Sequence, residues 1–196
     1  MRQTLYKKCH PLTWYFNRDL NDYFHFCHAL NRVADYLKKT NRSPIFLCIG
    51  SDRITGDCLG PLVGHKLTER YENRIPLYGT LEYPVHALNL SSSLELIQQR
   101  HKNAFLVAID ASLGSSKHIG SITVSKGSLS PGEGVKKDLP PVGNLSITGI
   151  VNSCRGDTEM LLQNTRLHLV NELSDFIFMG IANAFDDYFA AWDLHR

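Results

Sequence analysis

The sequence predicts a three-layer α/β fold in which helices cover a largely parallel, mixed central sheet. Two runs of apolar residues without polar alternation, at 45–49 and 104–109, are typical of strands buried on both faces. Segments with helical spacing of apolar residues lie between the strand candidates, and this alternation favours a parallel sheet between helix layers. Ligands in such folds bind beyond the carboxyl ends of the strands, so the loops there are the first candidates for a site.

Length and composition fit one soluble domain. The chain has 196 residues, 43% of them hydrophobic, and a formal net charge of +2. So small a charge gives no reason to expect a nucleic acid or membrane partner. No apolar run reaches the ~18 residues that a membrane span needs, and the N-terminus lacks a signal-peptide pattern. Five cysteines without a CxxC pair indicate a reduced, cytoplasmic protein with free thiols.

The chain is expected to begin with a loosely packed arm over 1–18, followed by a single domain over 19–196. Its first helix is predicted from Leu20, with Asn17 or Asp19 as the cap. The apolar stripe predicted for this helix is Leu20, Phe24, Cys27, Leu30, Ala34 and Leu37.

The strand at 45–49 leads into a polar loop and then a second helix. That helix is expected to start at Asp57, with Pro61 in its first turn, where a missing N–H group is tolerated. Gly60 and Gly64 on the same helix predict close packing against the sheet.

The middle of the chain predicts a short strand at 77–81 and a third helix. Ser92 and Glu95 have the spacing of a capping box, which places the helix start at Ser92. Leu94 and Ile97 then face inward.

The second half begins with the strand that ends at Asp110. A partly exposed strand at 119–124, a long loop at 125–143 and a further strand at 145–151 are expected to follow. Asp157 can cap the last helix. The apolar stripe of that helix is predicted to be Leu162, Leu169, Leu173, Phe176, Ile177, Ile181, Ala184 and Tyr188.

Two aspartates are the main candidates for chemistry. Asp57 stands where a loop becomes a helix, so a purely structural helix cap is its alternative role. Asp110 emerges from apolar surroundings; burial and a nearby second carboxylate both raise a carboxyl pKa, and the alternative is a carboxylate satisfied by loop N–H groups. At neighbouring strand ends the two side chains can act as base and acid, or hold a divalent metal.

Supporting roles are predicted for side chains in the same crevice, where 50–57, 110–112 and 152–153 are expected to meet. Thr55 is placed to orient Asp57 by a hydrogen bond. The candidates for substrate binding or support are Asp52, Thr55, His86 and Asn152. Asp52 can instead form only a surface ion pair with Arg53, and a lone loop histidine is commonly just solvated.

Two further residues are minor candidates. Cys58 lies at a helix N-terminus, where a thiol pKa can fall, although a buried structural thiol is the commoner case. His168 lies in the last helix and is expected to be packed or exposed rather than catalytic. No HExxH pattern or cysteine cluster is present, so a closed zinc site is not expected.

Short segments along the chain form a recognisable pattern. They read IGSDR at 49–53, TGD at 55–57, LGPLVG at 59–64, GTL at 79–81, PVHA at 84–87, AIDA at 108–111, SITGIVN at 146–152 and LQNTRL at 162–167. From about residue 44 onward the chain thereby resembles the YyaC-type sporulation proteins of spore-forming bacteria. Those proteins are similar to the germination protease, which degrades small acid-soluble spore proteins, and more distantly to the endopeptidases that mature nickel hydrogenases.

The resemblance implies a fold of the hydrogenase-maturation-protease and germination-protease type. The two motifs that supply catalytic aspartates in the germination protease fall on Asp57 and Asp110. The implied function is an aspartate-dependent endopeptidase of sporulation or germination, which acts on a peptide or small spore protein in the forespore or spore interior.

The resemblance also bears on metals. In the hydrogenase enzymes equivalent acidic positions and a histidine contact nickel, and this chain has no clear counterpart of that histidine. No cofactor is therefore expected, and a divalent metal, if bound, would be held by Asp57 and Asp110. The alternatives are a non-catalytic peptide- or protein-binding module on the same scaffold and a metal-dependent hydrolase; association into a homo-oligomer is left open.

Overall fold

The structure, a computed structural model, describes residues 13–72, 74–131 and 139–193. Within these ranges the strands form one mixed sheet in the order β1-β5-β6-β4-β2-β3. The strands are β1 (Thr13–Phe16), β2 (Ser43–Cys48), β3 (Leu77–Tyr78), β4 (Ala104–Gly114), β5 (Ile122–Lys126) and β6 (Leu145–Ser153). The strands β3, β2, β4 and β6 run parallel, and β5 and β1 are antiparallel at one edge.

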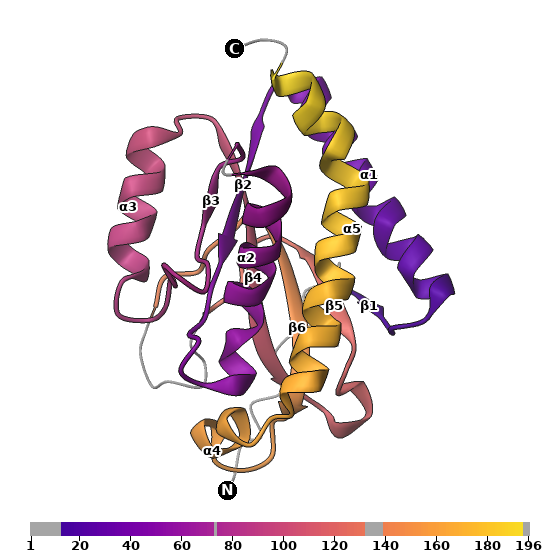
Figure 1. Cartoon of the computed structure of the whole chain (residues 1–196), viewed down its shortest axis with the longest axis vertical. Coiled ribbons are helices and arrows are strands. Elements are labelled where there is room, and N and C mark those ends of the chain that lie inside the picture. The colour runs from indigo at the N-terminus through magenta and orange to yellow at the C-terminus, as the bar shows by residue number, and fades with distance from the viewer. Residues whose placement is uncertain (1–12, 73, 132–138, 194–196) are drawn as a thin grey trace, which may run out of the picture.

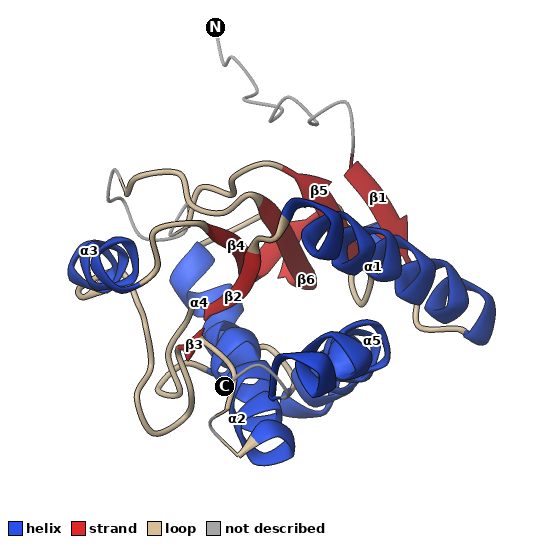
Figure 2. Cartoon of the chain, turned by 90° about the horizontal axis from the view of Figure 1, so that it is seen from above, coloured by secondary structure: helices blue, strands red, loops and turns tan. Residues whose placement is uncertain are grey.

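Helices cover both faces of the sheet, which confirms the predicted three-layer α/β fold. Figures 1 and 2 show three long helices on one face, α1 (Leu20–Thr40), α2 (Leu59–Tyr71) and α5 (Leu167–Asp193), and α3 (Leu90–Arg100) on the other. Shorter turns complete the chain: η1 (Thr55–Cys58), η2 (Ser116–His118) and α4 (Thr158–Gln163). In the part of the chain described, no helix combines the length and the hydrophobicity needed to cross a bilayer.

The apolar core lies on both sides of the sheet, and β2 shows why its sequence has no alternation. Phe46 and Cys48 belong to the larger cluster, under α1, α2 and α5. Ile45, Leu47 and Ile49 belong to the smaller cluster, under α3. Both sets of side chains are almost completely buried, so a polar residue at either set of positions would lose its contact with water.

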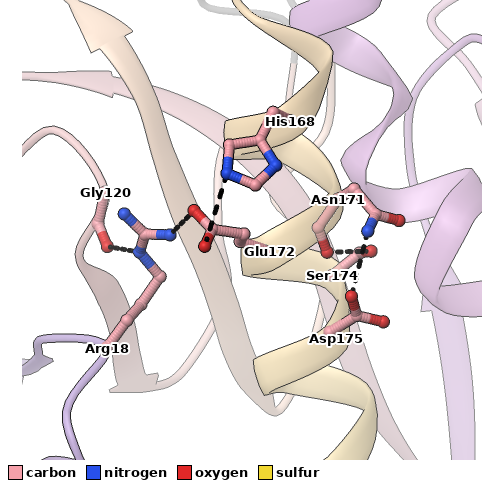
Figure 3. A network of polar contacts seen from close by, with 7 residues as sticks. All are labelled: Arg18, Gly120, His168, Asn171, Glu172, Ser174 and Asp175. Atoms are coloured by element: carbon pink, nitrogen blue, oxygen red, sulfur yellow. Dashed lines mark hydrogen bonds and ion pairs between the residues drawn. The ribbon is translucent and has the colours of Figure 1, made fainter.

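The segment expected to be an arm is in part a strand of the sheet. Residues 1–12 lie outside the described residues, but Thr13–Phe16 forms β1 and pairs with β5. The Phe16 side chain is buried. Arg18 Nε donates to the Gly120 carbonyl at 3.1 Å, and its guanidinium pairs with Glu172 on α5, as Figure 3 shows. The expectation of a loose arm is therefore wrong from Thr13 onward, because pairing and burial hold these residues on the core.

The first helix begins as predicted, but its buried face starts later. Asp19 is the cap and accepts the Asp22 N–H at 2.8 Å. Leu20 and Phe24 of the predicted stripe are largely exposed, whereas Phe26 is fully buried. The ring of Phe26 packs against two further phenylalanines of the core, Phe16 and Phe176. The buried face is therefore set by tertiary contacts with β1 and α5.

Two other predicted helix starts are shifted. The third helix begins at Leu90 after Asn89, so Ser92 and Glu95 lie inside it and form no capping box. The Ser92 hydroxyl instead donates to the Asn89 carbonyl at 2.9 Å. Asp157 caps the short α4 and not the last helix, by accepting the N–H groups of the first turn of α4.

Candidate active site

The carboxyl end of β2 is the centre of the candidate site. The Ile49 N–H group donates, at 2.7 Å, to the carbonyl that directly precedes Asp110 in β4. On the other side, the Gly50 N–H group donates, at 2.8 Å, to the carbonyl that directly precedes His86. These two bonds fix Asp110 and His86 on opposite sides of the end of β2.

Asp57 reaches the same place through the turn η1. The Ser51 N–H group donates to the Asp57 carbonyl at 3.2 Å. Gly50 has a φ of +139°, and a Cβ on it would lie 1.9 Å from the Asp57 carbonyl oxygen, so only glycine permits this approach. The long helix begins only at Leu59, and its cap residue Cys58 makes no side-chain capping bond. The prediction that the helix starts at Asp57 is therefore wrong by two residues, because η1 intervenes.

The environment of Asp57 shifts the pKa of its carboxyl group. Burial raises the pKa of this carboxyl group, and this effect exceeds the opposing effects of a hydrogen bond from the Ser51 backbone and of the nearby His86. The influence of His86 shows that its imidazole lies within electrostatic reach of Asp57.

His86 is held in place by its own loop. Its backbone N–H donates to Asn89 Oδ1 at 2.8 Å, and the Asn89 amide donates to the Pro84 carbonyl at 3.0 Å. The His86 Nδ1 also accepts the Leu88 N–H at 3.3 Å. Sequence reasoning missed Asn89 as a positioning residue; the available signal was an asparagine directly before a helix.

Asp110 is buried within a strand, with only 8% of its surface exposed. The prediction that β4 ends at Asp110 is wrong, because β4 continues to Gly114 in pairing with β6, where Thr148 lies opposite Asp110. Asp110 still stands where the pairing of β4 with β2 stops. Its Oδ1 accepts the Ala111 N–H at 2.8 Å.

A row of hydroxyl groups continues from Asp110 across the sheet. Thr148 Oγ1 lies 2.7 Å from Thr123 Oγ1, and the Ser112 hydroxyl donates to Thr148 Oγ1 at 3.3 Å. Ile109 and Ile147, one residue earlier in β4 and β6, belong to the larger core, so alternation turns the polar row toward the other face. Sequence reasoning missed this row, although polar residues at alternate positions of the last two strands were a readable signal.

For the candidate residues of the 50–58 segment other than Asp57, the structure offers less support for a role in the site. Asp52 is exposed. The hydrogen bonds among the described residues include none from the Thr55 hydroxyl to Asp57, and the ion pairs there do not include Asp52 with Arg53. Burial and the charges of Asp52 and Asp57 raise the pKa of Cys58. The thiol pKa is therefore shifted opposite to the expected direction, which disfavours Cys58 as a nucleophile.

Asn152 supports the site from behind. Its amide nitrogen donates to the Leu161 carbonyl at 2.9 Å and to Thr165 Oγ1 at 3.2 Å, and so attaches α4 to the end of β6. Thr165 and Leu162 in turn touch η1, since a Cβ on Gly56 would lie 2.9 Å from Thr165 Oγ1. We call this contact the η1–α4 clasp. Through Thr165 it connects Asn152 to η1 as a structural support, and the Asn152 amide nitrogen is already hydrogen-bonded.

A cleft opens beside His86. Its volume is about 610 Å³, and it lies between β3, α3 and the loop that joins them. Its polar lining includes Thr68, Thr80, His86, Asn89 and Ser93. The cleft offers a place for part of a ligand next to the end of β2.

The donor set for a metal is incomplete in the described part of the chain. No three His, Cys, Asp or Glu side chains are grouped there so as to hold a metal ion.

Comparisons with known proteins found a matching family, a similar protein sequence and a similar solved structure. The model of a family described as "Protein of unknown function (DUF1256)" matches residues 15–180. The protein YyaC of Bacillus subtilis (strain 168), described as uncharacterized, is 48% identical over 151 residues, which cover 76% of this chain and 74% of YyaC. Among solved structures, the [NiFe] hydrogenase maturation protease HycI from Thermococcus kodakarensis KOD1 aligns with a TM-score of 0.42 and 17% identity, over 71% of this chain and 92% of HycI.

Proposed function

The chain belongs to the DUF1256 family, and from that premise we propose that it is an aspartate-dependent endopeptidase with Asp57 and Asp110 as its acid/base pair. The observation that carries the proposal is the half-buried carboxyl group of Asp57 in η1, beside the end of β2, whose pKa desolvation raises. Asp110 and His86 are fixed on either side of that same strand end. Two carboxyl groups in unlike environments are the usual basis for separate acid and base roles.

The proposed reaction assigns one role to each aspartate. Asp110, as a carboxylate, takes a proton from a water molecule, and the oxygen of that water forms a bond with the peptide carbonyl carbon. Asp57, in its protonated form, gives its proton to the amine as the C–N bond breaks. Backbone N–H groups at the start of α2 are the proposed donors to the oxyanion of the intermediate.

The biological setting is proposed from the resemblance to the YyaC-type and germination proteins. We propose that the substrate is a peptide or small spore protein, cleaved in the forespore or spore interior during sporulation or germination. The 48% identity to YyaC supports the family assignment behind this proposal.

The test compares the purified protein with Asp110→Asn and Asp57→Asn on spore-protein substrates. Each variant is expected to lose activity by at least about 100-fold, since each removes a group that transfers a proton. Asp35→Asn, an exposed change on α1, is the matched control and should retain full activity. Equal cleavage by the parent and Asp110→Asn, or no cleavage by any form, would contradict the peptidase.

The second candidate is a peptide-binding module without turnover, and the cleft beside His86 favours it as an alternative. Such a module would bind the spore-protein peptide with similar affinity in the parent and in Asp110→Asn, and would leave the peptide intact. Calorimetric titration followed by mass spectrometry of the recovered peptide distinguishes the two functions.

A further inference from the structure

A second, larger cavity lies at the opposite end of the sheet from the candidate active site. Its volume is about 890 Å³, and it runs between α1 and the strands β1, β5 and β6, which lie side by side in Figure 2. Phe105 and Leu145, near the amino ends of β4 and β6, line it. Since Asp110 lies further along β4, nothing bound here would contact the proposed acid/base pair. We call this cavity the α1 groove.

The interior of the α1 groove is apolar and its rim is aromatic. Phe16, Val124 and Leu145, all buried in the larger core, form part of the lining. Trp14 and Tyr36 line the groove as well, and each is 48% exposed. Such surfaces favour the apolar body of a ligand.

The charged side chains of the α1 groove are mainly cationic. Arg32, Arg42 and Lys126 line it, together with two histidines, His25 and His28. Among the described lining residues, Asp22 supplies a carboxylate, and this carboxylate accepts the Asn17 N–H at 2.6 Å. The groove therefore presents an excess of positive charge around an apolar floor.

Arg42 is the most informative of these cations, because its guanidinium is fixed and yet incompletely bonded. Nη2 donates to the Ala104 carbonyl at 2.6 Å, and the guanidinium carbon lies 5.2 Å from the centre of the Phe105 ring. Tyr188 holds the Arg42 backbone by donating to its carbonyl at 2.8 Å. Nε is buried and has no hydrogen-bond partner among the described residues. A buried donor without an acceptor is unfavourable, and a carboxylate in the α1 groove, which Arg42 lines, would form a charge-assisted pair with this guanidinium.

We propose that the α1 groove binds a small organic anion, a carboxylate carried on an aromatic or aliphatic body. The carboxylate pairs with Arg42 and the cationic rim, and the body packs on the apolar floor. The cavity volume lies in the range of small-ligand sites in proteins. The proposal does not depend on the peptidase function, because no residue of the groove belongs to that site.

The test measures binding of 1-naphthoate to the purified 196-residue protein by isothermal titration calorimetry. Neutral 1-naphthamide, which has nearly the same size and shape, reports the contribution of the charge. We expect 1-naphthoate to bind at least about tenfold more tightly than the amide, as expected for a charge-assisted pair with arginine.

Two sets of variants locate the site. Arg42→Gln removes the fixed guanidinium, and Arg32→Gln with Lys126→Gln removes two exposed charges of the rim without touching the core. Either change is expected to weaken 1-naphthoate about tenfold. Arg100→Gln with Lys102→Gln, also exposed and at the end of α3 on the other face of the sheet, changes the net charge equally and should alter binding less than about twofold.

Several results would overturn the proposal. Equal affinity for 1-naphthoate and 1-naphthamide would show that the protein does not recognise the negative charge. Unchanged affinity for 1-naphthoate in both the Arg42 variant and the rim variant would show that it binds outside the α1 groove. A capped acidic peptide that displaces 1-naphthoate and binds more tightly would make the groove a protein-docking surface. A dimer in sedimentation that the rim variant dissociates would show that a second copy covers the groove.

Discussion

At the scale of single residues, the direction of the Asp57 pKa shift separates a catalytic role from a helix-capping role. A carboxylate that caps a helix is stabilised in its charged form, and its pKa falls. Asp57 shows the opposite shift, since burial raises its pKa, and the helix that follows starts only at Leu59. The capping alternative is therefore disfavoured.

The raised pKa predicts how Asp57→Asn changes stability with pH. Below about pH 4 the carboxyl group is protonated in both the folded and the unfolded state, so its charge contributes nothing. As pH rises, the unfolded chain releases this proton first, so the native protein loses stability until the pH exceeds the folded pKa. The asparagine variant escapes this loss, and we expect it to be more stable than the parent at pH 7, by roughly 0.5–2 kcal/mol.

Urea denaturation of both proteins from pH 3 to pH 8 measures this difference. The advantage of Asp57→Asn should appear as pH rises above about 4 and then level off. Asp35→Asn, on the exposed surface of α1, should follow the parent throughout. A variant less stable than the parent at pH 7 would identify Asp57 as a structural acceptor.

At the scale of elements, the sequence predicted those parts of the fold whose signals are local. The uninterrupted apolar run 45–49 predicted β2. Gly60 and Gly64 predicted the close contact between helix and sheet, and a Cβ on Gly64 would indeed lie 1.9 Å from the Gly79 carbonyl oxygen. The predicted ends of strands and helices were wrong where they depend on contacts with segments far away in the sequence. The strand β4 continues past Asp110 because β6 continues to pair with it, and no local pattern contains that information.

The candidate site follows the same division. The sequence identified Asp57, Asp110 and His86 as side chains to examine, because each follows or precedes a buried strand or helix. The backbone bonds that place them around β2 link segments far apart in the chain, and so does the η1–α4 clasp. From the sequence alone, the proximity of Asp57, Asp110 and His86 was an expectation that no local pattern could establish. Their catalytic roles stay a prediction.

The η1–α4 clasp predicts a local effect of Asn152→Ala. The variant loses the amide bonds to Leu161 and Thr165, so we expect a loss of about 1–2 kcal/mol in stability. Because Thr165 touches Gly56, amide hydrogen exchange should also accelerate over 51–58, whereas the core strand β4 should exchange at its former rate. Asn31→Ala, an exposed change on α1, is the control; faster exchange throughout the protein would show general destabilisation in place of a local clasp.

At the scale of the whole molecule, one apolar cluster joins the beginning of the described chain to its end. Phe16 of β1, Phe26 of α1 and Phe176 of α5 belong to the same cluster, which also includes residues of α2 and the central strands. At the surface, the ion pair of Arg18 with Glu172 also links the segment after β1 to α5 (Figure 3). A structure closed in this way is expected to unfold as a single cooperative unit.

Phe16→Ala tests that cooperativity at the edge of the sheet. Removing a buried phenyl ring is expected to lower the free energy of unfolding by about 3–5 kcal/mol. If β1 belongs to the cooperative unit, tryptophan fluorescence and far-ultraviolet circular dichroism will give coincident guanidinium transitions in both parent and variant, with the midpoint lower in the variant and the slope unchanged. Phe24→Ala, whose ring is 66% exposed, should change stability by less than about 0.5 kcal/mol. Separate transitions by the two probes, or a small effect of Phe16→Ala, would mean that the N-terminal strand detaches from a core that remains folded, as the sequence-based expectation of a loose arm implied.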